Sequence, residues 1–305
     1  MRTWNYLRTI SAKLIIPNFS PCSVLKLFQK SDSKKHFRYK LFCVFENDLE
    51  PSDTLSLVAT LKIHDHEKNK DKIIHGTITK IIYSGYKPDG NHYELEIQPV
   101  LCFLKYFQTN RIWVNKSINQ ILTDILSSHF YLKINHTIKL DYTFNLIDYL
   151  IQYNESDYLF LKRFLSNYQL NYYYIHDNER CVLYITHDSS LSLNLLGDRV
   201  GVRGSKNSTH PNQCATIESI YNNQMQAYRN MQGYYYIRHP FDQSNKPKGC
   251  ASKAIPYMQY HSGLQFALYP ETTVMLGYLN NNMNEPFILG VLANNKHPNP
   301  VNRNN

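Results

Sequence analysis

The spacing of apolar residues changes twice along this chain of 305 residues, and no other feature restricts its fold as strongly. Between Phe37 and Gln98 apolar residues repeatedly alternate with polar ones, which is typical of β-strands with one buried face. From Ser117 the spacing becomes that of an amphipathic helix. Beyond residue 213 short apolar runs between Pro and Asn clusters indicate strands again. The pattern predicts a mainly β protein with two helices, of the α+β class.

The first part of the chain predicts a small β-barrel. The turn sequence Lys87-Pro88-Asp89-Gly90 lies between the third and fourth candidate strands. Several short strands separated by turn signals are typical of a barrel or closed sheet. The four expected strands are Phe37–Glu46, Leu55–Ile63, Lys72–Tyr83 and Tyr93–Gln98.

Two helices are expected in the middle of the chain. Ser117 and Gln120 form a capping box at the start of the first helix, because each side chain can bond the other residue's backbone N–H. The second helix begins near Ser156-Asp157, and a hairpin closed by Asp177-Asn178 follows it. The apolar faces of the two helices are Ile118, Ile121, Leu122, Ile125 and Leu126, and Phe160, Leu161, Phe164, Leu165 and Tyr168. The hairpin strands are Tyr172–Ile175 and Val182–Ile185.

A segment rich in Gly, Ser and Asn precedes the C-terminal strands and is interpreted as a linker. The all-β module after it suggests a barrel of the OB type. Its candidate strands are Ala215–Tyr221, Gly233–His239, Thr272–Leu279 and Phe287–Leu292.

The net charge of +9 is compatible with an anionic partner such as nucleic acid. The basic residues are scattered, however, and the densest runs, Lys34-Lys35 and Lys68 to Lys72, lie in polar, turn-like stretches. The six cysteines show no CxxC spacing, which fits folding in a reducing cytoplasm. No apolar stretch is long enough to span a membrane, and residues 1–16 lack the continuous apolar core of a signal peptide.

Candidate catalytic and metal-binding residues have simpler structural interpretations. His64 and His66 resemble a metal pair, but no third ligand stands at a fixed spacing. Glu155 and Asp157 could act as paired carboxylates, whereas at a helix start they would cap free N–H groups and offset the helix dipole. Neither G-x-S-x-G nor a glycine-rich phosphate-binding motif occurs. No catalytic residue, metal or cofactor is therefore expected.

Several short motifs follow one another along the chain. The most specific is Gln152-Tyr153-Asn154-Glu155-Ser156-Asp157-Tyr158, which reads Q-Y-x-E-S-D-aromatic. It is accompanied by Ile74 to Thr79, Asn110 to Trp113, Gly233 to Asp242 and Glu285 to Gly290. Together they resemble the VgrG family of type VI secretion spike proteins and the related baseplate hub and tail spike proteins of contractile phages. The motif residues with an implied structural or interface role are His75, Gly76, Arg111, Gln152, Tyr153, Glu155, Ser156, Asp157, Gly233, Pro240, Phe241, Asp242, Pro286 and Gly290.

The resemblance implies a domain organisation along the chain. The expected parts are an N-terminal segment (1–36), a hub-type β-barrel (37–109), a helix-containing α/β region (110–188), a linker (189–213) and an OB-fold domain (214–305).

The resemblance also implies a function without catalysis. The chain would act as a homotrimeric spike or hub of a contractile injection apparatus, puncturing target membranes and carrying effectors. Implied partners are an Hcp-like tube protein, a PAAR-like tip protein, effector cargo and, transiently, the target membrane. The chain would be made in the bacterial cytoplasm and secreted through the apparatus without a signal peptide.

The chain departs from the family pattern in three places. A second hub barrel has no room between the hairpin and the OB module, and the β-helical needle has no counterpart. Gln169 occupies the position of the glycine that ends the second helix. Because a left-handed cap costs a non-glycine residue on the order of 1 kcal/mol, this helix is expected to end differently. The resemblance therefore implies a shortened spike.

Two alternative functions stay open at the level of sequence. The Tyr-rich stretches and the positive charge could serve a nucleic-acid-binding OB-fold protein, which would bind single strands in a salt-dependent way. The preferred interpretation places these tyrosines in barrel walls and subunit contacts. The chain could also be a remnant phage tail protein, which the sequence does not separate from a secretion spike.

Overall fold

The chain forms two compact units, each assembled from segments that are separate in sequence. The computed structural model describes residues 10–30, 37–140, 145–177, 179–187, 213–220, 226–259, 261 and 266–298. Unit 1 comprises the described residues within Met1–Phe107, Asp124–Thr143 and Leu161–Gly204. Unit 2 comprises those within Gln108–Thr123, Phe144–Phe160 and Ser205–Asn305.

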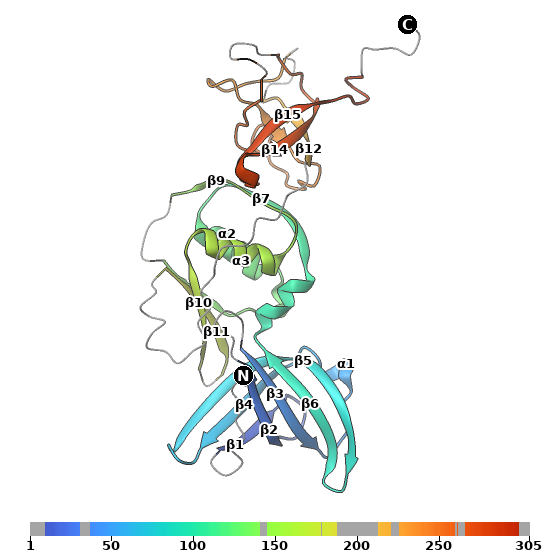
Figure 1. The fold of residues 1–305 in the computed structure, drawn as a ribbon, viewed down its shortest axis with the longest axis vertical. Helices are drawn as coiled ribbons and strands as arrows, with labels where there is room; N and C mark the ends of the chain where they lie inside the picture. Colours follow the sequence, from blue (N-terminus) through green and yellow to red (C-terminus); the bar gives the residue numbers. More distant parts are fainter. Residues whose placement is uncertain are drawn as a thin grey trace. The chain divides into compact units, whose positions relative to one another are not determined.

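Six antiparallel strands form a closed barrel in unit 1, in the order β1-β2-β3-β6-β5-β4 (Figure 1). The predicted barrel is confirmed, but it also includes two strands before Phe37 that the sequence analysis did not predict. A bulge between Val24 and Lys26 interrupts the alternation of β2, which hides this strand from a search for period two. The strands are β1 (Ile10–Ile15), β2 (Cys22–Lys30), β3 (Arg38–Phe45), β4 (Val58–Asp65), β5 (Lys70–Lys87) and β6 (Gly90–Gln98).

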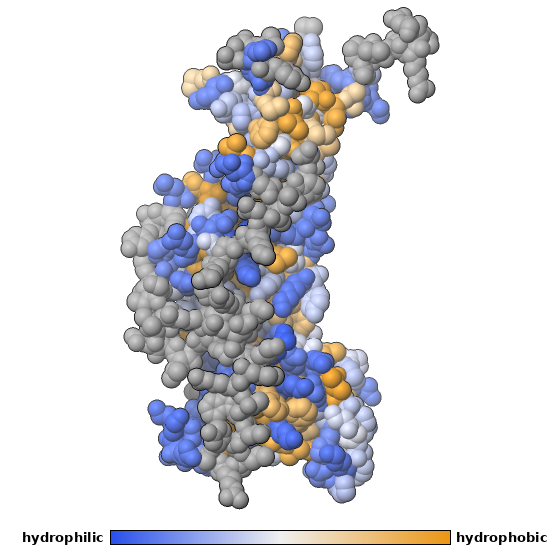
Figure 2. Space-filling view, in the orientation of Figure 1, coloured by the Kyte–Doolittle hydropathy of each residue, from blue (hydrophilic) through white to orange (hydrophobic). Residues whose placement is uncertain are grey.

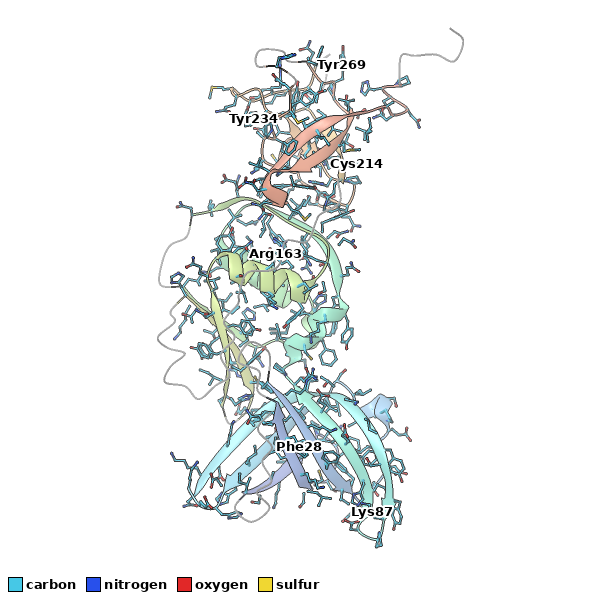
Figure 3. All side chains as sticks on the ribbon, viewed as in Figure 1. Phe28, Lys87, Arg163, Cys214, Tyr234 and Tyr269 are labelled. Atoms are coloured by element: carbon cyan, nitrogen blue, oxygen red, sulfur yellow. The ribbon has the colours of Figure 1, made fainter. Side chains whose placement is uncertain are left out.

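Apolar side chains fill the interior of this barrel. Phe37, Tyr39, Leu41 and Cys43, which the alternation predicts on one face, are at most 3% exposed. Lys87 pairs with Gly90 at the tip of the β5–β6 hairpin, as the turn sequence predicts (Figure 3). The short helix α1 (Pro51–Thr54) lies between β3 and β4, and the 3-10 helix η1 (Val100–Tyr106) follows β6.

Both predicted α-helices are present, as α2 (Ile118–Ser127) and α3 (Asp157–Asn167). The capping box of α2 is formed, because the Ser117 N–H donates to Gln120 Oε1 at 3.0 Å and the Gln120 N–H to Ser117 Oγ at 3.3 Å. The apolar face of each helix is buried: Ile118, Ile121, Leu122, Ile125 and Leu126 in α2, and Phe160, Leu161, Phe164 and Leu165 in α3.

Helix α3 ends in a left-handed residue although that residue is not glycine. Gln169 has a φ of 54°, and the Leu170 N–H donates to the Leu165 carbonyl at 2.8 Å. This is the hydrogen bond of a Schellman cap. The expectation that Gln169 changes the end of the helix is therefore wrong, because the cap hydrogen bond and the burial of Leu170, 1% exposed, accompany the left-handed conformation.

A small sheet of unit 1 has the strand order β10-β11-β8. The predicted hairpin is confirmed as β10 (Asn171–His176) and β11 (Cys181–Thr186). The Asp177 carboxylate accepts the N–H groups of Glu179 and Arg180, which closes its turn; Asn178 lies outside the described residues. The parallel strand β8 (His136–Lys139), preceded by the 3-10 helix η2 (Phe130–Leu132), was not predicted.

Unit 2 combines a two-stranded ribbon with a four-stranded sheet. The ribbon is β7 (Gln108–Lys116) and β9 (Ile147–Ser156), and the sheet has the order β13-β12-β14-β15. The four predicted C-terminal strands are confirmed as β12 (Gln213–Glu218), β13 (Tyr236–Arg238), β14 (Thr273–Tyr278) and β15 (Pro286–Leu292), with the 3-10 helix η3 (Leu279–Asn281) after β14. Within the described part of this module the strands form an antiparallel sheet, and closure into a barrel is not seen.

Figure 2 shows an apolar surface over β14 and β15, where Val291 is 46% exposed. The expected linker (189–213) lies outside the described residues except for Gln213, the first residue of β12. No helix in the described ranges has the length and apolar character needed to cross a membrane.

Candidate functional site

Two residues of the most specific motif, Gln152 and Asp157, form a buried polar cluster with Thr109 and Arg111. It is called the Arg111 cluster below. Arg111 Nη2 lies 3.0 Å from Asp157 Oδ2, and Arg111 Nη1 donates to Gln152 Oε1 at 3.2 Å. Gln152 Nε2 donates to Asp157 Oδ1 at 2.7 Å, and the Thr109 hydroxyl donates to the same oxygen. Gln152 and Asp157 are both 0% exposed. The buried carboxylate thus has a charged partner and two further donors, which offsets its desolvation.

Local structure explains how these residues meet. Arg111 pairs with Gln152 across the β7–β9 ribbon, at a register shift between Thr109 and Arg111. Asp157 is the first residue of α3, directly after β9. The Ser156 hydroxyl accepts the Leu159 N–H at 3.3 Å, so Ser156 caps the helix and Asp157 is available to the ribbon. The expected capping role of the acids is therefore taken by Ser156, and Asp157 forms the ion pair.

The other face of the ribbon contacts the C-terminal module within unit 2. Tyr149 Oη lies 2.6 Å from His239 Nε2, and the rings of Tyr153 and Phe241 are 5.0 Å apart between centroids. The Ile151 N–H donates to Asn284 Oδ1 at 3.3 Å. These residues form one apolar cluster, here called the ribbon joint, which consists of Tyr149, Ile151 and Met283 with Ile112, Val114, Tyr153, Phe241 and Tyr278 around them.

The buried pair Tyr149 and His239 is uncharged. Burial raises the pKa of Tyr149 well above its usual value and lowers the pKa of His239 to about 4. The Tyr149 hydroxyl can therefore donate to His239 Nε2, and the ring hydrogen is then on Nδ1, which is buried without a hydrogen-bond partner. An unpaired buried donor costs roughly 1–3 kcal/mol. Both rings are buried despite this cost, which indicates that they are tightly packed.

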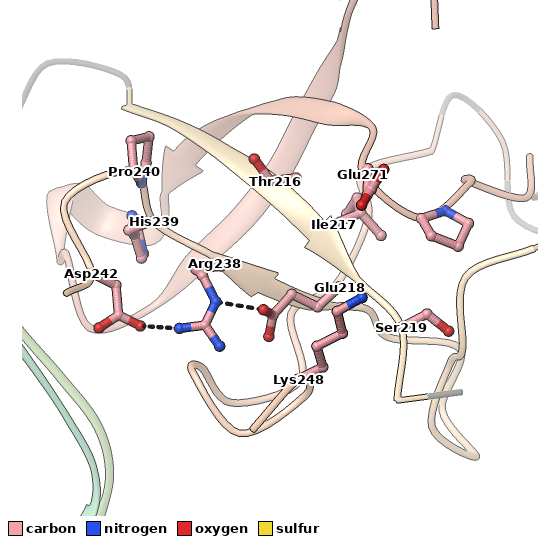
Figure 4. A pocket seen from close by; sticks show the side chains of 11 residues that line it. Thr216, Ile217, Glu218, Ser219, Arg238, His239, Pro240, Asp242, Lys248 and Glu271 are labelled. Atoms are coloured by element: carbon pink, nitrogen blue, oxygen red, sulfur yellow. Dashed lines mark hydrogen bonds and ion pairs between the residues drawn. The ribbon is translucent and has the colours of Figure 1, made fainter. Parts of the chain in front are cut away.

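A second polar cluster, the Arg238 cluster, lies in the C-terminal sheet and forms part of an open pocket of about 660 Å³ (Figure 4). Arg238 Nε donates to Glu218 Oε1 at 2.5 Å, and Nη1 to Asp242 Oδ2 at 3.0 Å. The guanidinium also donates to the carbonyls of Ser244 and Lys246. All its nitrogens are thus engaged within the chain, so Arg238 is not a free anion-binding group. The Pro240-Phe241-Asp242 motif therefore anchors its own loop.

The motif pair His75-Gly76 lies on β5 in unit 1. His75 Nε2 is 2.9 Å from the Asp177 carbonyl, which can only accept, so Nε2 carries the hydrogen and Nδ1 accepts from Thr60 Oγ1 at 3.0 Å. The His75 backbone N–H donates to His176 Nδ1 at 3.1 Å. A Cβ on Gly76 would lie 2.4 Å from Ile97 Cγ2, so only glycine fits the packing there.

The remaining motif residues have individual structural positions. Gly233 has a φ of 80° in the turn before β13, and Pro286 opens β15. Glu155 pairs in register with Thr109 at the ribbon end. A Cβ on Gly290 would meet open space, so no packing contact requires glycine at that position.

The geometry does not bring titratable residues together for metal binding. His64 Nδ1 lies 2.6 Å from Asp71 Oδ1 and its ring stacks edge-on with His66, but no group of three potential ligands occurs among the described residues. Sequence reasoning missed the strands that carry the Arg111 cluster, and with them the contact between ribbon and C-terminal module.

The fold is mainly β, and the Arg111 cluster joins motif residues from the two ribbon strands and α3. Residues 33–248 match the family model of the phage tail baseplate hub (GPD), and the chain belongs to this family. No curated protein matches the sequence closely enough to be counted as a relative.

One solved structure shares this fold, and others align more loosely. The E. coli c3393 protein is described as a component of the type VI secretion system with structural similarity to the T4 bacteriophage tail proteins gp27 and gp5. It aligns with a TM-score of 0.70 and 17% identity over 92% of this chain and 100% of its own. A chain of a PdpA–VgrG complex aligns with a TM-score of 0.44 and 14% identity, over 88% of this chain and 52% of its own. A 43 kDa tail protein of a Shewanella oneidensis prophage aligns with a TM-score of 0.39 and 9% identity, over 93% of this chain and 98% of its own.

Proposed function

We propose that this protein is a spike or hub subunit of a contractile injection apparatus of the type VI secretion kind, acting as a trimer without catalysis. The observation that carries the proposal is the baseplate hub family match, which extends from β3 of the barrel through the ribbon to β13 of the C-terminal sheet. The buried clusters support a mechanical role, since their polar groups bond within the chain and hold elements in place.

The proposal includes the finer organisation expected from the sequence. The C-terminal sheet would be part of an OB-type barrel. The expected domain boundaries at residues 109, 188 and 213 would separate hub barrel, α/β region, linker and OB domain, whereas the expected boundary at residue 36 is dropped because β1 and β2 belong to the barrel. The family motif residues would serve packing and subunit contacts. The partners would be an Hcp-like tube protein, a PAAR-like tip protein and effector cargo, and the chain would leave the cytoplasm through the apparatus to puncture the target membrane.

An exposed apolar surface supports self-association. Val291 on β15 is 46% exposed, and Leu279, the residue after β14, is 54% exposed. Figure 2 shows an apolar surface over the same two strands. Exposed apolar patches commonly mark contacts with another chain. A threefold assembly would cover this surface.

Sedimentation equilibrium of the purified chain tests the proposal. The expected result is a species with three times the chain mass at micromolar concentration. Val291→Lys, which places a charge on the exposed edge, should weaken the association, whereas Lys62→Gln on the barrel should not. A stable monomer of the unmodified chain at micromolar concentration would count against the trimer.

A hub of a phage tail is the second candidate, because the family is described as a phage tail baseplate hub. The neighbouring genes distinguish the two. Sheath, tube and ATPase genes beside this one would assign it to a secretion apparatus, whereas capsid and tail-fibre genes would assign it to a phage.

A further inference from the structure

Two cysteines face each other inside the barrel of unit 1. Cys22 is the first residue of β2 and Cys43 lies on β3, and they are 6% and 1% exposed within the same apolar core. Val24 pairs directly with Cys43. Since side chains two residues apart on a strand share a face, Cys22 points to the same side as Val24, diagonally across from Cys43.

The Cys22 thiol influences the ionisation of Cys43. Hydrogen bonding from Cys22, together with burial, holds the pKa of Cys43 far above its usual range. All six cysteines of the chain are free thiols in the structure. A disulfide requires the two sulfur atoms to approach to about 2 Å. Cys22 is the first residue of β2, and the bulge between Val24 and Lys26 interrupts the regular pairing of β2 with β3 on this side of the barrel.

We propose that Cys22 and Cys43 form a redox-sensitive pair, which closes to a disulfide between β2 and β3 when the folded protein meets a disulfide oxidant such as oxidised glutathione. The Cys22 thiolate attacks one sulfur of the oxidant, which releases one glutathione thiol after protonation and leaves a mixed disulfide. Cys43 loses its proton, attacks the Cys22 sulfur and releases the second glutathione thiol. Two protein thiols thereby lose two electrons and two protons, and the oxidant gains them.

Because both thiols are buried, they react slowly with disulfide oxidants and stay reduced inside the cell. Only the thiolate reacts, and the raised pKa of Cys43 keeps the thiolate fraction of that residue low. A reducing cytoplasm would therefore leave both thiols intact, while prolonged exposure to an oxidising medium would close the bond. The chemistry of the pair stands by itself; only its biological setting, release from the producing cell, rests on the proposed function.

The disulfide would stabilise the barrel. It would close the segment from Cys22 to Cys43, which contains the connection between β2 and β3. A cross-link of this kind restricts the unfolded chain and so favours the folded state. The expected effect is a higher urea midpoint for barrel unfolding, reversed by a reductant.

Thiol counting on a chain without its exposed cysteines tests the proposal. The exposed residues Cys214, labelled in Figure 3, and Cys250 are first replaced by serine. This Cys214→Ser, Cys250→Ser protein is incubated folded with oxidised glutathione, denatured and titrated for free thiols, and its peptides are mapped. Two of the four remaining thiols should disappear, with Cys22 linked to Cys43.

Two variants in the same background provide the controls. Cys22→Ala should abolish the loss of thiols and the rise in urea midpoint, and Cys43→Ala serves the same purpose if the first variant does not fold. Cys102→Ala should change neither, because Cys102 is a buried thiol in η1 that does not belong to the core cluster with Cys22 and Cys43. Survival of all four thiols in the folded protein, or a bridge that involves Cys102 or Cys181, would overturn the proposal. The readout does not depend on oligomeric state, so its failure differs from failure of the trimer.

Discussion

Two glycines of the family motifs have different physical reasons to be glycine. Gly76 lies where a Cβ would overlap Ile97 and approach the Gln98 carbonyl to 3.1 Å, whereas a Cβ on Gly290 meets nothing within 4 Å. Both are motif glycines within candidate strands, so the sequence alone does not separate them. The structure therefore separates a packing requirement from a position without one.

Gly76→Ala should destabilise unit 1 by about 1–3 kcal/mol, because the added methyl group forces Ile97 and its strand apart. Gly290→Ala should change the free energy of unfolding by less than about 0.5 kcal/mol, as is usual for sites without special packing. Urea unfolding followed by tyrosine fluorescence measures both. Equal effects of the two substitutions would contradict this assignment.

The Asp157 carboxylate accepts hydrogen bonds from three side chains of the Arg111 cluster. Asp157→Asn should lower the free energy of unfolding by about 3 kcal/mol, because Arg111 loses its charged partner in a buried site. The exposed pair of Glu271 and Lys296 offers a matched control, and Glu271→Gln should cost less than about 1 kcal/mol. A small effect at Asp157 would show that the Arg111 cluster does not stabilise the ribbon.

At the scale of elements, the helices and strands that could be predicted from the sequence are those in which apolar residues recur at a regular spacing. Helix α2 was predicted together with its cap, because the apolar stripe and the Ser117 capping box agree. Strand β2 was missed because its bulge interrupts the alternation, and β8 because four residues give too short a period. The ribbon was missed because Arg111 and Gln152 meet only through pairing of strands 41 residues apart. The structural role of the candidate residues stays a prediction, and their contacts could be found only once the strand pairing was known.

The end of helix α3 offers a stabilising substitution. Gln169→Gly should raise the free energy of unfolding by about 1 kcal/mol, because glycine adopts the left-handed conformation without the Cβ penalty. Lys162→Gly, at an exposed position inside the same helix, should lower it by about 1 kcal/mol. Chemical denaturation monitored by circular dichroism measures both changes, and the opposite sign for Gln169→Gly would refute the cap.

The contact between β5 and the end of β10 predicts a loss of stability in acid. Burial, together with the nearby His75 and Lys72, lowers the pKa of His176 to about 4, below its ordinary value of 6.5. The neutral ring accepts the His75 N–H. Between these values the unfolded chain binds more protons, so stability is full above pH 6.5 and falls as the pH drops toward about 4. The expected loss is on the order of 2 kcal/mol.

The variant His176→Asn isolates this contribution. Asparagine offers an acceptor near the position of Nδ1 but does not titrate, so the variant should lose less stability between pH 7 and pH 4 than the original chain. His239 contributes a similar loss in both proteins, since burial also lowers its pKa to about 4. Parallel pH profiles for the two proteins would contradict the role of His176.

At the scale of the whole molecule, the compact units combine segments that the linear organisation keeps apart. Unit 2 joins the ribbon with the C-terminal sheet, and the chain changes unit within both α2 and α3. The linear domain boundaries expected from the sequence stay a prediction. Phe241, for example, packs against Tyr153 of the ribbon, although the second ribbon strand ends at Ser156, 85 residues before Phe241 in the sequence.

A fragment spanning residues 205–305 should accordingly expose the apolar surface of the ribbon joint. It should bind the dye ANS, which reports exposed apolar surface, more strongly than the full chain does. Phe241→Asn should reduce dye binding by the fragment, but in the full chain it should lower the free energy of unfolding by about 3 kcal/mol. A folded fragment with no dye binding would contradict the importance of the joint.

The ribbon joint also has a consequence for synthesis on the ribosome. Tyr149 and Ile151 emerge long before His239, Phe241 and Met283, the residues that cover them in the finished protein. During translation at about 5–20 residues per second, this interval leaves an apolar strand uncovered for several seconds. The nascent chain therefore presents a site for chaperones, or for premature association with neighbouring nascent chains, until the C-terminal sheet has been made.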